Sequence, residues 1–529
     1  MVVGPTVAAT ALKWPTLRGP VGRGALGPGC RRADGNLLEG VHADSSNELV
    51  QKVLSSVPEL ASWPAWYRHP RALSNGHVHT ILAAKARRTR TVKYHRLLVP
   101  TPDGGTLAVD LLCGIRRARA RDPQVGALGS LLSGGAVAGA AEDTSRTDTL
   151  FVDAAPPLEQ NRPLLLLASG LGGGSQDTYV RSMAATAAER GWQVAVVNMR
   201  ACGGSPVTSP RLFSAYRGAT DDVRLTVRHL RETRLGGGGV VAAVGWSNSG
   251  TIVNNVLAEQ ARGTEDVAQC DLKCSLASPS RRQTETGASP LQEQSLVSHQ
   301  ATTHAGDASH AIGAACSLAT PLDMPANSAN LQRPFHKAVY DRNLGRSLQA
   351  LWGAARNQFV DASGAPLRVP YWDGLSRPDK LDPTGGDKAG GAFLADDALA
   401  STALSIRELD EALTRRQYGY ESVDDYYAAA SSDQRLPLID APLLLLNAFD
   451  DPIVPGLSLL SAIERSRANP SCLFAVTSHG GHLGWADRDD SFPWGGSGWV
   501  ERASLGFLEA ALGIAPASEC ETIACEVFD

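Results

Sequence analysis

The sequence has few cysteines and few aromatic residues, and it has no long apolar run. Nine cysteines, an odd number, are spread thinly over 529 residues, without a CxxC pair or a Cys/His cluster of zinc spacing. We therefore expect no disulfide framework, no metal and no cofactor, and we expect a reducing intracellular compartment. No window of about 20 residues is apolar enough to span a bilayer.

The charges nearly balance, at a net −4. Because nucleic-acid-binding domains carry a strong positive excess, this balance argues against a nucleic-acid partner. Apolar residues make up 43% of the chain and charged residues 20%, proportions that allow a large buried core and exclude a wholly disordered chain. The 53 glycines and 31 prolines are many for a compact enzyme and indicate added loops.

Both termini are expected to lie outside the folded domain. Residues 1–50 predict a disordered tail, within which residues 1–33 contain basic but no acidic side chains. That composition fits an organelle transit peptide, for example for a plastid, and it equally fits an unstructured tail. Residues 516–529 predict a C-terminal tail.

Short apolar runs alternate with helical segments along the chain. The strongest runs lie at 163–168, 193–198, 240–244, 442–447 and 472–477. Uninterrupted apolar strands separated by helices are typical of a mostly parallel sheet that helices cover on both faces. The sequence therefore predicts the α/β class.

One α/β domain is expected over residues 55–515, interrupted by looser regions. Residues 114–160 and 263–310 are rich in small or polar residues, and we interpret them as insertions. Residues 320–435 contain several helical segments between two strand patterns and predict a helical cap.

A serine stands where one apolar strand turns into a helix. The strand at 240–244 leads into Gly-Trp-Ser-Asn-Ser-Gly at 245–250, and a helical run follows. A nucleophilic serine on such a turn needs small residues two positions before and two after it. Gly245 meets the first demand for Ser247, whereas Ser249 stands at the second. Ser249 as the nucleophile fits the turn less well, and an ordinary strand–helix turn is the third interpretation.

A base and an orienting acid follow in the chain order that a serine nucleophile of this fold requires. Asp451 comes after the strand at 442–447, and His482 comes after the strand at 472–477. Ligands of open α/β sheets bind at the carboxyl ends of the strands, so we expect both side chains to lie near Ser247. Asp450 and His479 are the alternatives for the two roles.

Several further motifs resemble those of the AB hydrolase-4 family, the YheT-like branch of the α/β-hydrolases. They are N-G-H-V-H-T at 75–80, T-P-D-G-G at 101–105, G-L-G-G-G-S-Q-D-T-Y at 170–179, N-M-R-A-C-G-G-S at 198–205 and the tyrosine pair at 426–427. These motifs span the ordered parts of the chain from about residue 60 to residue 515. The resemblance implies an α/β-hydrolase fold with a helical cap.

The resemblance also implies roles for individual residues. Ser247 would be the nucleophile, His482 the general base and then acid, and Asp451 the group that holds the imidazole tautomer. The backbone N–H groups of Leu171 and Asn248 would form the oxyanion hole. Two positions depart from the family, since Ser169 replaces a histidine and Ser249 replaces a glycine.

The activity expected from this resemblance is that of a serine hydrolase acting on carboxylic esters, above all those of acyl lipids. Two alternatives stay open, namely an acyltransferase that passes the acyl group to an alcohol and a non-catalytic hydrolase-fold protein that only binds its ligand. The expected partner is a small-molecule or lipid ester. With no spanning segment in the sequence, a lipid substrate would entail at most peripheral membrane contact.

Overall fold

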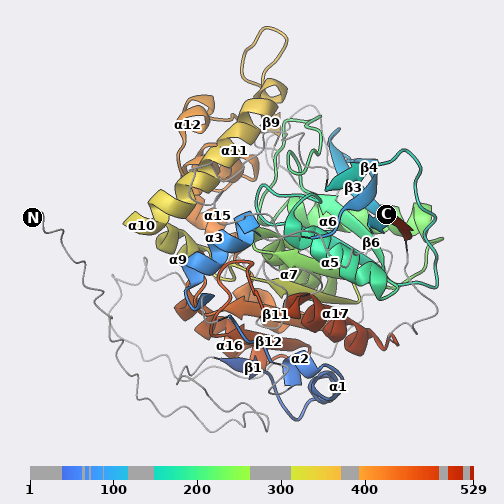
Figure 1. Ribbon diagram of the computed structural model, residues 1–529. Helices are drawn as coiled ribbons and strands as arrows, with labels where there is room; N and C mark the ends of the chain where they lie inside the picture. Colours follow the sequence, from blue (N-terminus) through green and yellow to red (C-terminus); the bar gives the residue numbers. More distant parts are fainter. Residues whose placement is uncertain are drawn as a thin grey trace, which may run out of the picture.

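The structure is a computed structural model, and it describes residues 39–61, 66–70, 73–86, 89–116, 148–262, 311–370, 392–487, 498–515 and 525–528. A central sheet carries helices on both faces (Figure 1). In spatial order the strands of the sheet are β1, β12, β11, β8, β7, β5, β6, β3, β2 and β4, and β13 pairs with β3.

The sheet is mostly parallel, which confirms the predicted fold class. All strands from β12 to β6 in that order run parallel to one another, whereas towards the edges β1 pairs antiparallel with β12, β3 with β6, and β2 with β3. The strands are β1 Gly40–His42, β2 Val92–Pro100, β3 Thr106–Arg116, β4 Thr149–Phe151, β5 Leu164–Ala168, β6 Gln193–Asn198, β7 Val241–Trp246, β8 Ala314–Leu318, β11 Leu443–Ala448, β12 Cys472–Thr477 and β13 Glu526–Phe528.

Among the described residues, seven helices pack against the faces of this sheet. They are α1 Glu48–Ser56, α2 Pro58–Ala61, α5 Thr178–Glu189, α6 Ala219–Arg234, α7 Asn248–Arg262, α16 Leu459–Arg467 and α17 Trp499–Leu512. Because side chains alternate along a strand, Leu164 and Leu166 of β5 join the apolar cluster under α6, α7 and α16. Leu165 and Leu167 join the cluster under α1, α5 and α17.

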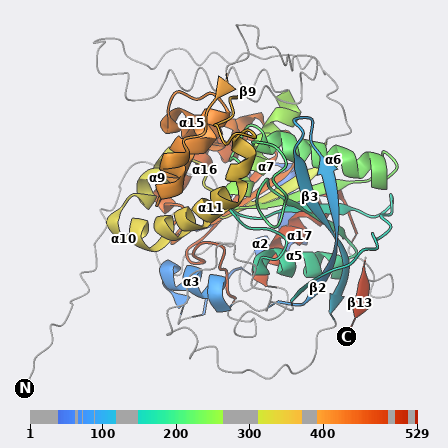
Figure 2. The ribbon, with the colours of Figure 1, turned by 90° about the horizontal axis from the view of Figure 1, so that it is seen from above.

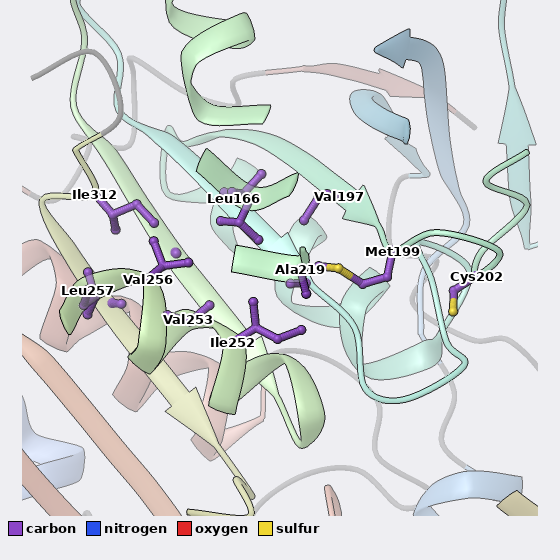
Figure 3. Packing of buried hydrophobic residues seen from close by; sticks show 14 of the residues in the cluster. Leu166, Val197, Met199, Cys202, Ala219, Ile252, Val253, Val256, Leu257 and Ile312 are labelled. Atoms are coloured by element: carbon purple, nitrogen blue, oxygen red, sulfur yellow. The ribbon is translucent and has the colours of Figure 1, made fainter. Parts of the chain in front are cut away.

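Figure 3 shows the first of these clusters, where one face of α7 packs onto the sheet through side chains that include Ile252 and Val256. Fully burying an aliphatic side chain of this size contributes roughly 1.5–3 kcal/mol. Both faces of the central strands therefore need apolar residues. This demand explains why these strands are uninterrupted apolar runs in the sequence.

A second group of helices lies between β8 and β11 in the sequence and gathers apart from α1, α2 and α17 (Figures 1 and 2). We call it the cap. Its members are α9 Met324–Leu331, α10 Pro334–His336, α11 Arg342–Ala355, α12 Asp397–Thr402, α13 Ile406–Leu409, α14 Arg415–Gln417 and α15 Val423–Ala430. The π-helical turn η4 Lys337–Asp341 joins α10 to α11. Shorter elements complete it, namely η5 Arg356–Phe359, β9 Val369–Pro370, β10 Ala392–Phe393, η7 Asp410–Thr414 and η8 Asp433–Leu438.

Ordered structure extends further towards both ends than the sequence predicts. Residues 1–38 lie outside the described residues, but β1 and the first three residues of α1 fall within the expected tail at 1–50. Strand β1 pairs with β12, and α1 packs on α17. At the other end β13, inside the expected tail at 516–529, pairs with β3. Both strands are three residues long. Such segments carry almost no pattern of their own, because a long-range partner determines their structure.

The two expected insertions lie mostly outside the described residues, which stop at residue 116 and resume at 148, and stop at 262 and resume at 311. Strand β4, near the end of the first one, pairs with β2. None of the helices in the described ranges is both long enough and apolar enough to cross a membrane.

A buried ion-pair network joins the motif at 101–105 to the motif at 198–205. Arg200 Nη1 donates to Asp103 Oδ2 at 2.7 Å, and Arg200 Nε donates to Asp222 Oδ2 at 2.8 Å. All three side chains are buried. Burial alone would raise the pKa of Asp103, but the charge and hydrogen bonds of Arg200, helped by the Thr101 hydroxyl and the charge of Arg211, together outweigh it and hold the pKa at about 2. The two motifs therefore form one structural unit.

Replacing Arg200 should destabilise the fold strongly. We expect Arg200→Met to lower the free energy of unfolding by about 3–5 kcal/mol, because Asp222 then stays buried without its cation. Arg356→Met is the matched control, since it removes the half-exposed pair of Arg356 with Asp397 and should cost less than about 1 kcal/mol. Urea unfolding measures both changes, and equal losses would contradict a structural role for the buried network.

Candidate active site

Ser247 occupies a sharp turn between β7 and α7. Its φ angle is 52°, in the left-handed backbone region that residues other than glycine rarely adopt. The N–H of Ser247 donates to the carbonyl oxygen of Leu318 in the neighbouring strand β8, at 2.8 Å. A Cβ atom on Gly245 would collide with the carbonyl oxygen of Ser249. The turn therefore requires a glycine two positions before Ser247, as the sequence predicts.

Asp451 follows β11 and points its two carboxylate oxygens in different directions. Its Oδ1 accepts the backbone N–H groups of Ile453 at 2.8 Å and Val454 at 3.0 Å. Its Oδ2 lies 2.8 Å from Nδ1 of His482. Because the loop fixes one oxygen, the other is held in place for the imidazole.

His482 follows β12 and links Asp451 to Ser247. Its Nε2 lies 3.0 Å from Ser247 Oγ. The hydrogen bond at Nδ1 determines which tautomer leaves Nε2 free to accept a proton. The structure thus brings Ser247, His482 and Asp451 together in one hydrogen-bonded chain, in the arrangement of a catalytic triad.

Thr80 of α3 (Gly76–Ala86) holds the His482 loop, a contact that the sequence analysis did not assign. Its Oγ1 accepts the backbone N–H of His482 at 2.7 Å and donates to the carbonyl oxygen of Gly76 at 2.7 Å. Gly481 has a φ of 57° and lies so close to Gly76 that a side chain would not fit. The motif at 75–80 contained this signal, but only the fold shows which loop the motif contacts.

The alternative residues do not join this chain of hydrogen bonds. His479 Nδ1 lies 3.1 Å from Asp450 Oδ2, so these two residues pair with each other. Ser249 Oγ donates to the backbone carbonyl oxygen of Ser169. Cys202, in the turn after Arg200, is buried, and burial raises the pKa of its thiol to about 12, far from that of a reactive thiolate.

A cavity of about 270 Å³ opens at Ser247 and His482. The two expected oxyanion donors, Leu171 and Asn248, also line it. Asn248 begins α7, where backbone N–H groups have no acceptor within the helix. Among the described residues, the backbone N–H groups of Leu171 and Asn248 have no acceptor. Both are therefore available to a ligand in the cavity.

Hydrogen bonds between polar side chains hold the loop that carries Leu171 in place. Ser169 Oγ donates to Asp177 Oδ2 and lies 2.7 Å from the hydroxyl of Tyr179. Tyr179 OH accepts the N–H of Gly170 at 3.1 Å and donates to Asp177 Oδ2 at 2.9 Å. Burial raises the pKa of the Tyr179 hydroxyl well above its usual value, so it stays protonated.

Ser249 connects this loop to the helix that follows Ser247. Its hydroxyl is buried and bonds to the carbonyl oxygen of Ser169. The two departures from the family pattern are therefore in direct contact. Together they tie the backbone that presents Leu171 to the backbone that presents Asn248.

The wall of the cavity on the cap side is partly apolar and partly polar. Burial raises the pKa of Asp410 to about 6, and the hydroxyl of Tyr427 donates to its Oδ2 at 2.8 Å. The apolar lining comes from Leu171, Phe213, Pro321, Met324, Leu331, Leu344, Leu348, Ile406, Ile453 and Leu483. Within the described ranges no group of three or more His, Cys, Asp or Glu side chains is placed to hold a metal ion.

Removing the Ser249 hydroxyl should slow turnover without weakening binding. We expect Ser249→Ala to lower kcat for p-nitrophenyl butyrate about tenfold at unchanged KM, because the two oxyanion donors lose their mutual alignment. Ser466→Ala is the matched control, since its buried hydroxyl also donates to a backbone carbonyl oxygen, that of Ile463, on the remote helix α16. Equal kcat values for the two variants would argue against this role of Ser249.

No family model matches the chain. The relatives include an embryogenesis-associated protein of Picea glauca, 28% identical over 84% of this chain and 72% of its own. A medium-chain fatty acid ethyl ester synthase/esterase of Saccharomyces cerevisiae is 28% identical over 66% of this chain and 62% of its own. A monoacylglycerol lipase of the same yeast is 25% identical over 82% and 78%.

Among solved structures, a Pyrococcus furiosus esterase aligns with 79% of this chain and 91% of its own at 11% identity, with a TM-score of 0.38. A putative esterase of Escherichia coli, YheT, is a sequence relative at 25% identity over 63% of this chain and 75% of its own. Strand order, helix layers and relatives agree with the resemblance found in the sequence. The chain therefore has the α/β-hydrolase fold, and its sequence relatives are consistent with the AB hydrolase-4 family that its motifs resemble.

Proposed function

We propose that this α/β-hydrolase cleaves carboxylic esters of acyl lipids through the nucleophile Ser247, with His482 as base and Asp451 as its orienting acid. One observation carries the proposal. Ser247 Oγ, His482 and Asp451 form a continuous hydrogen-bonded chain at the mouth of a cavity whose lining is largely apolar. The order of the three residues along the chain is that of α/β-hydrolases.

The first half of the reaction forms an acyl-enzyme. Ser247 Oγ attacks the ester carbonyl carbon while its proton passes to Nε2 of His482. The carbonyl oxygen becomes an oxyanion that accepts hydrogen bonds from the backbone N–H groups of Leu171 and Asn248. When the carbon–oxygen bond to the alcohol breaks, the alcohol oxygen takes the proton from His482 and leaves.

The second half regenerates the enzyme. Water attacks the acyl carbon and gives its proton to His482, which returns that proton to Ser247 Oγ as the carboxylic acid departs. The carboxylate of Asp451 stabilises the imidazolium in both halves without taking its proton. Since Asp451 Oδ1 is already held by two backbone N–H groups, Oδ2 keeps its direction throughout.

Acyl lipids are the substrate class that this cavity suits best. Leucine, isoleucine, methionine and phenylalanine side chains from the sheet edge and the cap line it and would bury an acyl chain. Relatives of the chain are named as a monoacylglycerol lipase, a phospholipase and a fatty acid ethyl ester synthase/esterase. In this proposal the cap, at about residues 320–435 of a domain spanning 55–515, selects the acyl chain, and contact with membranes is peripheral.

Replacing the nucleophile should abolish both labelling and turnover. We expect Ser247→Ala to eliminate covalent labelling by a fluorophosphonate and to lower kcat for acyl esters at least a thousandfold, because among the described residues Ser247 supplies the hydroxyl that is hydrogen-bonded to His482 Nε2. Asp451→Asn should keep its fold and lower kcat roughly 10³–10⁴-fold. The asparagine amide would no longer hold the imidazole of His482 in the tautomer whose Nε2 accepts a proton. Ser249→Gly should still be labelled. Labelling that persists in Ser247→Ala would sink the proposed nucleophile, and no labelling of the wild type would favour a non-catalytic binding protein.

Transfer of the acyl group to an alcohol is the second candidate, and the name of the yeast synthase/esterase favours testing it. The acyl-enzyme is common to both reactions, so the acceptor alone decides the product. For hydrolysis we expect the free acid to stay the main product as ethanol is raised through the millimolar range. Chromatography of both products measures the ratio. Ester that exceeds acid at low alcohol concentration would identify a transferase.

A further inference from the structure

The helical run from α10 through η4 to α11 has two different faces. Leu344 and Leu348 line the cavity at Ser247. Phe335 and Arg342, in contrast, are exposed, and exposed positions recur about one helical turn apart from Phe335 to Arg346. The reaction uses only the inner face. The outer face has no role in it.

The outer face is basic. Its exposed cations are Arg333, Lys337, Arg342 and Arg346, and none of them forms an ion pair with any residue that the structure describes. Asp341 is the only acidic residue between Leu331 and Ala355. It is buried and accepts the backbone N–H of Ile406 at 2.9 Å; it interacts electrostatically with Lys337 but forms no ion pair with the three exposed arginines.

Apolar side chains stand beside these cations. Phe335 is 58% exposed and lies between Arg333 and Lys337 in the sequence. Its ring packs edge-on against His77 of α3, with ring centroids 5.1 Å apart. The next exposed residues of α3 include Val78, at 43%, and Ile81, at 39%. Figures 1 and 2 both place α3 next to α9 and α10.

We infer that this surface, made of Arg333, Phe335, Lys337, Arg342 and Arg346 with Val78 and Ile81 of α3, docks the protein on an anionic lipid surface. We call it the basic cap face. The inference rests on the proposed function, since a lipid esterase must reach substrates that are held in a membrane.

Charge complementarity favours a lipid surface as the occupant. Unpaired arginine and lysine side chains are attracted to anionic headgroups, and each one near the surface strengthens binding. Exposed aromatic and aliphatic side chains beside them can enter the boundary between headgroups and acyl chains. Because the inner side of the same helices lines the cavity, docking here would bring the lipid source next to Ser247. A nucleic-acid partner is disfavoured by the overall charge of −4.

The test measures binding of the full chain to vesicles by sedimentation. We expect stronger binding to phosphatidylcholine vesicles that contain phosphatidylserine than to phosphatidylcholine alone, and weaker binding as salt is raised. The double variant Arg342→Glu/Arg346→Glu should lower the partition onto anionic vesicles at least tenfold. Phe335→Ser should weaken binding to both kinds of vesicle.

Leu98→Ser is the matched control, because Leu98 of β2 is 59% exposed, as much as Phe335, and lies outside the basic cap face. It should bind like the wild type. Equal loss in Leu98→Ser and Phe335→Ser, no preference for phosphatidylserine, or no vesicle binding by the wild type would each overturn the inference. Turnover of soluble p-nitrophenyl butyrate, measured in parallel, separates the two proposals. Its absence in the wild type sinks the proposed esterase, whereas its retention in a variant that has lost vesicle binding supports the docking surface.

Discussion

The left-handed backbone of Ser247 is the constraint on which the rest of the site depends. A φ of 52° costs free energy for a residue with a side chain, so the surrounding structure must hold it. The Leu318 carbonyl oxygen accepts the N–H of Ser247. Because Gly245 has no side chain, α7 can begin directly after the turn. The same turn lifts Ser247 Oγ towards His482 and leaves the Asn248 N–H at the free end of α7. The proposed nucleophile and one of the two proposed oxyanion donors thus come from one piece of backbone geometry.

The second proposed oxyanion donor, Leu171, lies in the loop after β5, and the contact between Ser249 and Ser169 joins this loop to α7. With a glycine at position 249, the loop after β5 and α7 would lack the hydrogen bond that a side chain at this position can form between them. Ser249 adds a buried hydroxyl that donates to the Ser169 carbonyl oxygen, while the Ser169 side chain turns the other way to Asp177 and Tyr179. Two changes that look like losses when each is compared with the family pattern are compatible because they meet in space.

Much of the fold could be predicted because the deciding signals are local. The apolar strands at β5, β6, β7, β11 and β12 need no partner to be recognised, and their ends lead directly to the three residues of the proposed triad. Signals that depend on a distant partner were missed. Thr80 lies some 400 positions from the His482 N–H that it accepts. Strand β1 pairs with the outer side of β12, and β13 pairs with residues 114–116 of β3, beyond the part of β3 that pairs with β6. Choosing Asp451 over Asp450 rested on the prolines at 452 and 455, which fix the loop after Asp451, and the resemblance pointed to the same residue.

One helical run of the cap, from α10 through η4 to α11, carries leucines that line the cavity and also exposed cations of the basic cap face. Asp341 lies where η4 meets α11, and its carboxylate accepts both the Ile406 N–H and the Gln332 side chain. These bonds hold the start of α11 against α13, so the inner leucines and the outer arginines keep a fixed relation. A force that pulled the basic cap face onto a surface would be transmitted to the wall of the cavity, because packed helices move as units. If the substrate is held in a membrane, docking through a rigid cap would orient the cavity towards that membrane. No rearrangement at Ser247 would then be needed.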